Sequence, residues 1–400
     1  GPGPIAMRAM TSAGLMLLLA AAPVALPPGL PPQVDLAPDP AFVLPDSLLA
    51  QLTLVTDLAL DPDGSLYLVD RNFPAVLHLE RSGALRRIIG RRGGGPGEFS
   101  YIYQVGVTRD SLWAVDPGLL RITIFPTSGR GQLTVPFGSS RNDAASALRE
   151  PVRRGIPAVM LADGGFVVED ALGMDSTGGV PTRIAVLRTD RDFVLRDTIT
   201  VLPFGHTPLR FVYRNGEAHF MQPFSDDPTI GYASDGSLIA QVNRTAARGR
   251  AESSFTVTAW RGDGRRLWRR EVAYRPARIT RAMVDSVAEL LGGNQDPHLP
   301  GRPVTPDSIR ARLYRPPMLP PVERVVVGRD QSVWLKVRFA DSPPGRAEWL
   351  LLSPRGFPLQ RVNTDAGFRL LEAERTMLWG VEGDADDIPR VVRYRVSMNS

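Results

Sequence analysis

The chain has 400 residues, 43% of them hydrophobic, and its 38 glycines and 37 prolines are many for a helical protein. The net charge is +5, but Lys336 is the single lysine, and the arginines alternate along the chain with 42 acidic residues. This spread predicts a solvated arginine-rich surface and no nucleic-acid partner, while the absence of cysteine excludes disulfides, thiol chemistry and cysteine-ligated zinc.

The first 32 residues have the pattern of a leader followed by a linker. Residues 1–6 precede the first methionine, Met7, and Arg8 adds a positive charge before an apolar stretch over residues 15–26 and a proline-rich segment. This order is typical of a secretory signal, and the stretch is shorter than the ~20 residues of a membrane-spanning helix. We therefore expect a periplasmic or secreted protein with no stable membrane span, unless the signal segment is retained as an anchor.

A pair of strands around a tight acidic turn recurs six times along the chain. Its copies occupy residues 57–70, 105–116, 159–170, 230–243, 325–338 and 369–382. A second hairpin follows each of the first five, at residues 76–89, 121–135, 183–201, 255–272 and 349–362. Two hairpins form a four-stranded unit, and a series of such units indicates propeller blades. We therefore predict an all-β fold, a six-bladed β-propeller of four-stranded antiparallel blades that forms one domain over residues 33–400.

The largest insertion, residues 275–321, separates the fourth and fifth units. Within residues 278–293, Ile279, Met283, Val287 and Leu290 or Leu291 recur at helical spacing, and Gly292 stands where a helix would stop. We expect a short helix here, which either packs on the blade rims or serves as a lid or docking helix.

The sixth unit lacks its outermost strand, because the chain ends soon after residues 390–396. Residues 33–44 are extended in character and belong to no other unit. We expect this N-terminal segment to supply the missing strand and close the ring.

The second unit resembles the NHL repeat. The resemblance rests on GGPGEF at residues 94–99, the run from Asp110 to Asp116, the strand at residues 121–125 and the turn at Ser128 and Gly129. The first unit is similar, whereas units three to six keep the pattern with longer loops. The resemblance implies a six-bladed NHL-like propeller, and it is specific only over about residues 57–130.

Loop lengths distinguish the two faces of such a propeller. With strands lettered A to D from the axis outward, the A-to-B and C-to-D turns are all tight. The B-to-C loops and D-to-A crossings carry the long insertions, at residues 138–157, 205–228 and 275–321. Because loops on a rigid scaffold commonly carry function, we expect the binding surface on the B-to-C face.

Each B strand ends in a polar residue that we expect near the mouth of the central channel. These candidate ligand-binding residues are Asp70, Asp116, Asp170, Asn243, Arg338 and Glu382. Oxygen ligands suit Ca²⁺, although Arg338 disfavours a symmetric metal site. The alternative is that the aspartates make turns by bonding their own backbone.

Two further groups are candidates for chemistry. Asp384, Asp386 and Asp387 could hold a metal ion, although a solvated charge run is the alternative. His206 and His219 share one D-to-A crossing and are candidate general bases, with surface histidines as the alternative.

The sequence shows no recognisable catalytic constellation. We therefore predict a non-catalytic exported module that holds a protein, peptide or glycan partner on its loop-rich face, without a firm cofactor. The alternative is a propeller hydrolase or lyase, similar to lactonases or virginiamycin B lyases, with a divalent cation such as Ca²⁺ at the channel mouth.

Overall fold

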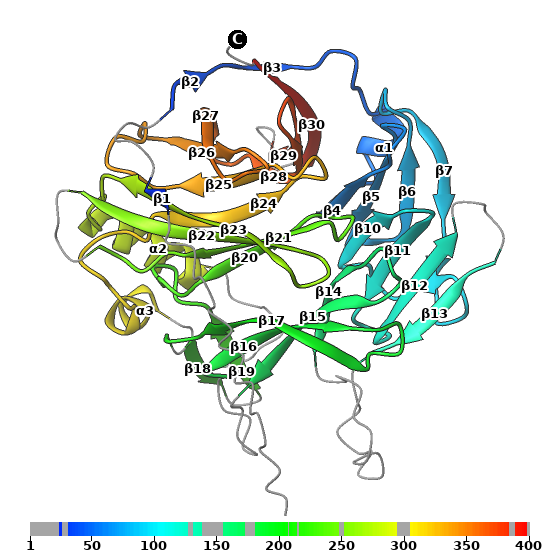
Figure 1. Ribbon diagram of the computed structural model, residues 1–400, viewed down its shortest axis with the longest axis horizontal. Coiled ribbons are helices and arrows are strands. Elements are labelled where there is room, and N and C mark those ends of the chain that lie inside the picture. Colours follow the sequence, from blue (N-terminus) through cyan, green and yellow to red (C-terminus); the bar gives the residue numbers. More distant parts are fainter. Residues whose placement is uncertain are drawn as a thin grey trace, which may run out of the picture.

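The computed structural model describes residues 24–25, 31–126, 131–137, 155–172, 181–206, 208–213, 216–247, 252–293, 305–383 and 389–397. In this part of the chain, six antiparallel sheets radiate from a common axis (Figure 1). The protein is a six-bladed β-propeller of four-stranded blades, as its repeated hairpins predict.

The first three blades follow one another in chain order, each running from the axis outward. Blade 1 comprises β4 (Val55–Leu60), β5 (Leu66–Asp70), β6 (Phe73–Leu79) and β7 (Leu85–Ile89). Blade 2 comprises β10 (Gln104–Thr108), β11 (Ser111–Asp116), β12 (Arg121–Pro126) and β13 (Leu133–Pro136). Blade 3 comprises β14 (Ile156–Met160), β15 (Phe166–Leu172), β16 (Arg183–Thr189) and β17 (Leu195–Pro203).

The other three blades each include a strand from the N-terminal part of the chain. Blade 4 comprises β20 (Thr229–Tyr232), β21 (Leu238–Asn243), β22 (Ser253–Arg261) and β23 (Arg266–Tyr274), with β1 (Val24–Ala25) at its edge. Blade 5 comprises β24 (Val322–Val327), β25 (Val333–Val337), β26 (Arg346–Leu352) and β27 (Pro358–Asp365), with β2 (Gln33–Val34) at its edge. Blade 6 comprises β28 (Arg369–Glu374), β29 (Met377–Gly383), β30 (Pro389–Val396) and β3 (Leu36–Pro38).

Aspartate side chains shape the tight turns between strands A and B. Asp63 accepts the backbone N–H of Ser65 at 2.7 Å, and Asp235 accepts that of Ser237 at 3.0 Å. In the first of these turns, Gly64 lies between Asp63 and Ser65, and its φ of 84° is in the left-handed region that favours glycine. Asp163 and Asp330 form the same bond, so these local bonds explain the acidic residue at four of the six predicted turns.

The core lies between neighbouring sheets, because each blade buries both faces. One cluster joins Val105 and Leu112 of blade 2 to Tyr67 of blade 1. Another joins Trp379 and Val381 of blade 6 to the first blade. Apolar packing therefore continues from the last blade to the first.

The N-terminal segment, residues 31–39, runs along the outside of blades 5 and 6. β2 pairs with β27 in parallel, and β3 pairs with β30 in antiparallel fashion (Figure 1). Asp39 then forms a buried ion pair with Arg393, 2.6 Å from its Nη2, and a second with Arg395 at 2.7 Å. Although burial opposes ionisation, hydrogen bonds from Arg395, Ala41 and Arg393 hold the pKa of Asp39 below its usual value.

The insertions beside blade 4 form a small subdomain of their own. It contains a hairpin of β18 (Leu209–Tyr213) and β19 (Gly216–Phe220) together with helices α2 (Arg281–Gly293) and α3 (Pro306–Arg312). The helix expected over residues 278–293 is present, and of the two alternatives Leu290 and Leu291 it is Leu291 that packs inward, whereas Met283 is 40% exposed, so the expected apolar face was wrong at that position. The buried face contains Val284 and Ala288, which pack on α3 and the hairpin.

The short elements lie at the rims. They are α1 (Asp46–Leu49), which packs on blade 1, and the parallel pair β8 (Arg91–Arg92) and β9 (Glu98–Phe99), which precedes blade 2. No helix among the described residues is long and apolar enough to cross a membrane.

Candidate functional site

A cavity of about 970 Å³ occupies the axis of the propeller and is lined by the innermost strand of every blade. Its lining also includes Arg71, Tyr101, Pro117 and Leu120, which belong to B-to-C loops and D-to-A crossings. The cavity therefore opens on the face that carries the long loops. Toward the other face the space around the axis is narrower. Gly106 of blade 2 and Ser234 beyond β20 approach so closely that a Cβ on Gly106 would lie 2.5 Å from the carbonyl oxygen of Ser234.

Charged groups from blades 1, 5 and 6 meet in one part of the cavity wall. Asp57 on β4 accepts the backbone N–H of Val105 at 3.0 Å, and burial raises the pKa of this carboxyl group to about 6. Arg324 on β24 and Arg369 on β28 line the same cavity, and both interact electrostatically with Asp57. Neither arginine forms an ion pair with Asp57, so the attraction acts over a longer distance than that of an ion pair.

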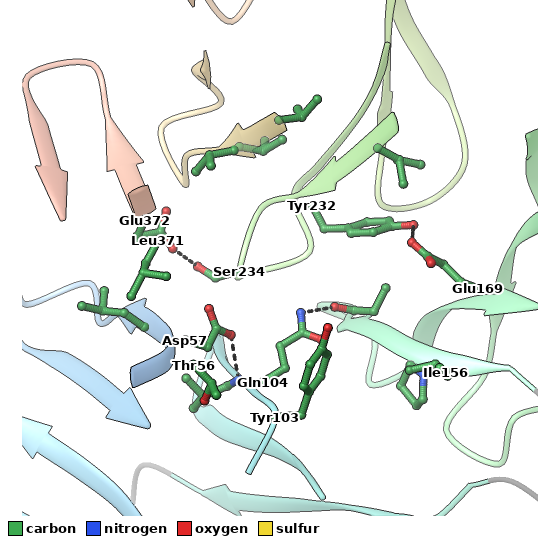
Figure 2. A pocket seen from close by; sticks show the side chains of 18 of the residues that line it. Thr56, Asp57, Tyr103, Gln104, Ile156, Glu169, Tyr232, Ser234, Leu371 and Glu372 are labelled. Carbon is green, nitrogen blue, oxygen red and sulfur yellow. Dashed lines mark hydrogen bonds between the residues drawn. The ribbon is translucent and has the colours of Figure 1, made fainter. Parts of the chain in front are cut away.

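Glu372 lies on the same inner strand as Arg369 and is 2% exposed. Its carboxyl group accepts hydrogen bonds from the Ser234 hydroxyl at 2.6 Å and from the Ala373 N–H at 3.1 Å (Figure 2). Burial nevertheless raises the pKa of Glu372 to about 8. The Glu372 carboxyl group is therefore mainly protonated, and so mainly uncharged, at neutral pH.

The opposite part of the wall is held by two polar contacts. The Tyr232 hydroxyl on blade 4 donates to Glu169 on blade 3 at 2.6 Å, and burial together with this carboxylate raises the pKa of Tyr232 (Figure 2). The Gln104 amide on blade 2 donates to the Ala158 carbonyl on blade 3 at 2.6 Å. The first contact joins the inner strand β20 to β15, the second joins the inner strands β10 and β14, and both fix the shape of the cavity.

Four large apolar side chains are exposed around the mouth of the cavity. They belong to blades 1 to 3 and are Leu54 (42% exposed), Tyr103 (56%), Leu120 (43%) and Ile156 (58%). We call these four residues the apolar rim. Single exposed apolar residues are ordinary, but a group of them around a concave opening is typical of a binding surface.

Two of the predicted ligand-binding residues are buried carboxylates whose oxygens already accept hydrogen bonds from nearby backbone N–H groups. Asp70 is fully buried and accepts the N–H groups of Thr53, Leu54 and Asn72 at 2.8, 2.6 and 2.8 Å. Asp116 is also fully buried and accepts the N–H groups of Ser100 and Leu119 at 2.7 and 3.0 Å. Each carboxylate ties a D-to-A crossing to the end of the B strand, which favours the turn-making alternative.

The other four B-strand ends also lie outside the cavity lining. Asn243 is exposed, Asp170 is half-buried, and Glu382 accepts a hydrogen bond from the Tyr394 hydroxyl beside a separate cavity at blade 6. Arg338 pairs with Glu323 at 2.7 Å, and Glu323 itself lines the central cavity. The structure therefore does not bring the six predicted residues together at the channel mouth.

The candidate histidines belong to the segment between blades 3 and 4. His206 contacts Asp226 at 2.7 Å and stacks on Tyr314 with ring centroids 3.7 Å apart, beside the hairpin and α3. His219 lies on β19 opposite Arg210. His206 does not line the central cavity, and the role of both histidines as bases stays a prediction.

The predicted metal candidates Asp384, Asp386 and Asp387 lie outside the described residues. Among the residues that the structure does describe, no group of three histidine, aspartate or glutamate side chains could hold a metal ion. The cavity carboxylates are instead engaged by protein groups: Asp57 by a backbone N–H, Glu372 by Ser234 and a backbone N–H, Glu169 by Tyr232, and Glu323 by Lys336 and Arg338.

The charged residues of the inner strands were not predicted from the sequence. Asp57, Arg324 and Glu372 each interrupt an apolar run, in VTDLAL, VERVVV and RLLEAE. A charge within a strand buried on both faces is costly unless it faces a cavity. This local break in the apolar pattern was the signal that could have found them.

No family model matches the chain, and no curated protein does. Solved structures that resemble it include a Bacteroides fragilis protein that is inferred to be exported, at 12% identity and a TM-score of 0.43, with 91% of this chain and 96% of the other covered. Regucalcin from Agrobacterium tumefaciens, a calcium-binding protein, has 9% identity, a TM-score of 0.35 and coverages of 92% and 96%. BamB from Moraxella catarrhalis has 14% identity, a TM-score of 0.34 and coverages of 85% and 85%.

Likeness at this level carries no argument about function. The fold assignment rests on the six sheets themselves, and membership of the NHL family stays a prediction.

Proposed function

We propose that the chain is an exported, non-catalytic binding module that holds an apolar segment of a peptide or protein in the mouth of its central cavity. The observation that carries this proposal is the apolar rim around a cavity of about 970 Å³. Export is supported by the leader-like pattern of residues 7–26.

A peptide fits this mouth better than a glycan does. Leu54, Leu120 and Ile156 offer aliphatic surface, which peptide side chains can cover, whereas sugars are bound mainly by aromatic faces and polar groups. Burial of aliphatic surface contributes about 25 cal/mol per Å². The rim can therefore supply affinity, while the polar wall below it supplies selectivity.

The experiment pans a random peptide library displayed on phage against the full chain. The test variant carries Leu54→Gln and Ile156→Gln, and the matched control carries Leu85→Gln and Ile88→Gln. The control residues are similarly exposed, at 41% and 50%, but lie on β7 at the outer edge of blade 1. We expect peptides enriched on the wild type to bind the control equally and the test variant at least about tenfold more weakly.

Two results would overturn this proposal. Peptides that bind the test variant as well as the control would place binding away from the rim. Glycans retained on an array in the absence of any enriched peptide would replace the peptide by a sugar as the partner.

A second candidate function, a hydrolase or lyase, is favoured by one observation. Asp57 and Glu372 face one cavity with pKa values raised to about 6 and about 8, and perturbed acids in a cleft are typical of catalytic sites. Metal analysis of the purified protein, with its melting temperature measured with and without Ca²⁺, tests this alternative. A stoichiometric ion that raises the melting temperature would favour the enzyme.

A further inference from the structure

We infer that Arg324 and Arg369 form a carboxylate-binding subsite in the cavity, and that the segment bound at the rim is the C-terminal residue of a peptide. This inference rests on the proposed function, because it names the part of the peptide that enters the cavity.

The two arginines lie where a ligand passing the mouth would meet them. Arg369 is the first residue of β28, and Arg324 is the third residue of β24 on the neighbouring blade. Inner strands run from the loop-rich face inward, so both side chains line the cavity just below its opening.

The two guanidinium groups have more N–H donors than the protein offers acceptors. Among the described residues, the Arg324 side chain forms no hydrogen bond or ion pair, and the Arg369 side chain donates only to the Val55 carbonyl. An arginine presents five N–H donors in a planar fork that matches a carboxylate. The wall therefore holds donors that a ligand can satisfy.

The charge balance near the two arginines is positive. Burial lowers the pKa of Arg324 and of Arg369, and repulsion by Arg369 adds to the effect at Arg324, but a guanidinium stays charged at neutral pH. Asp57 is the one carboxylate that attracts both. Two half-buried positive charges facing one negative charge leave room for a second anion.

The other acids of the cavity do not supply that anion. Glu323 is paired with Lys336 at 3.1 Å and Arg338 at 2.7 Å, and Glu169 accepts the Tyr232 hydroxyl. Burial keeps Glu372 mainly protonated at neutral pH, because it raises the pKa of this group to about 8.

A carboxylate fits this arrangement better than a phosphate does. Asp57 repels a dianion more strongly than a monoanion, and its own charge already offsets one arginine. The apolar rim lies on blades 1 to 3 and the two arginines lie on blades 5 and 6, where Arg369 donates to Val55 next to Leu54 of the rim. A ligand that contacts both the rim and the arginines needs an apolar body and a singly charged end, which the last residue of a peptide provides.

The experiment uses N-acetyl-leucine, which mimics a C-terminal residue, and its neutral amide, N-acetyl-leucinamide. Binding of both to the full chain is measured by ligand-observed NMR at pH 7.5 and low salt. We expect the acid to bind at least about tenfold more tightly than the amide, because charge-assisted hydrogen bonds to arginine form only with the acid. High salt should reduce this preference only in part, since the subsite is half-buried.

The variants assign the preference to the two side chains. Arg324→Gln and Arg369→Gln should each abolish most of the preference for the acid, and Arg324→Lys should retain part of it. The control is Arg188→Gln, which removes a guanidinium of blade 3 that is 23% exposed and paired with Asp163, away from the cavity. The wild-type comparison of acid and amide stands even where a variant fails to fold.

The outcomes separate this inference from the proposed function. Equal binding of acid and amide, lost in the variant with Leu54→Gln and Ile156→Gln, would overturn the inference and leave the proposed function in place. Inorganic phosphate that displaces N-acetyl-leucine at equal concentration would replace the carboxylate by a general anion site. No binding of either probe, with no peptide enriched from the library, would overturn both.

Discussion

Two sets of acidic residues in the blades differ in how many hydrogen-bond donors surround them. Asp70 and Asp116 close the second strands of blades 1 and 2, and each carboxylate is filled by two or more backbone N–H groups. Asp57 and Glu372 stand on inner strands and receive few donors, so burial raises their pKa values. The repeated acids hold the crossings between blades, whereas the acids that are not repeated face the cavity.

Removing a repeated acid should have the largest effect on stability. Asp70→Ala leaves the buried N–H groups of Thr53 and Leu54 without an acceptor, and we expect a loss of about 3 kcal/mol in the free energy of unfolding, measured by urea denaturation. Asp192→Ala, which removes an exposed carboxylate, should change stability by less than about 0.5 kcal/mol. A variant with wild-type stability and lost peptide binding would make Asp70 a ligand residue.

Glu372→Gln should act in the opposite direction. The pKa of this glutamate rises from 4.5 to about 8 on folding, so its contribution to stability is fully present below pH 4.5 and is lost as the pH rises through 8. Glutamine stays neutral and keeps the hydrogen bond to Ser234. We expect the variant to be more stable than wild type by an amount that grows across this window and reaches about 3 kcal/mol by pH 7.

The pH dependence of unfolding measures this effect, with Glu80→Gln as the exposed control. A constant difference between Glu372→Gln and wild type from pH 5 to pH 8 would show that Glu372 is ionised throughout this range in the folded protein.

Asp57→Asn should show the smallest change in stability. Its pKa rises from 3.8 to about 6 on folding, so the wild type loses stability between these values and the variant does not. We expect a gain of roughly 2 kcal/mol above pH 6, measured by urea denaturation. The same change removes the negative charge beside Arg324 and Arg369, so N-acetyl-leucine should bind more tightly, and weaker binding would contradict the subsite.

The architecture could be predicted because it is encoded locally and repeated. Each blade needs a turn such as Asp63–Gly64 and alternating strands, and these signals appear in every copy. Helix α2 was found from its spacing, but its buried face depended on α3 and the hairpin, which no local pattern reveals. Helix α3 itself was missed, although Thr305 before Pro306 is a helix start and caps the Ser308 N–H at 3.2 Å.

The candidate site was predicted only as far as its face. Loop length correctly indicates the side on which the cavity opens, since loops are the variable part of a propeller. The cavity wall combines one or two side chains from each blade, for example Asp57, Arg324 and Glu372. Their approach depends on the closed ring, so repeat equivalence pointed to Asp70 and Asp116 instead.

The pairing of β3 with β30 has a consequence for how the molecule is made. β3 precedes β30 by more than 300 residues, so the sixth sheet can gain its fourth strand only after synthesis has reached β30. The buried ion pairs of Asp39 with Arg393 and Arg395 form at the same late step. Blade 6 therefore stays incomplete, and Asp39 stays without its two arginine partners, until the strand that carries Arg393 and Arg395 has been made.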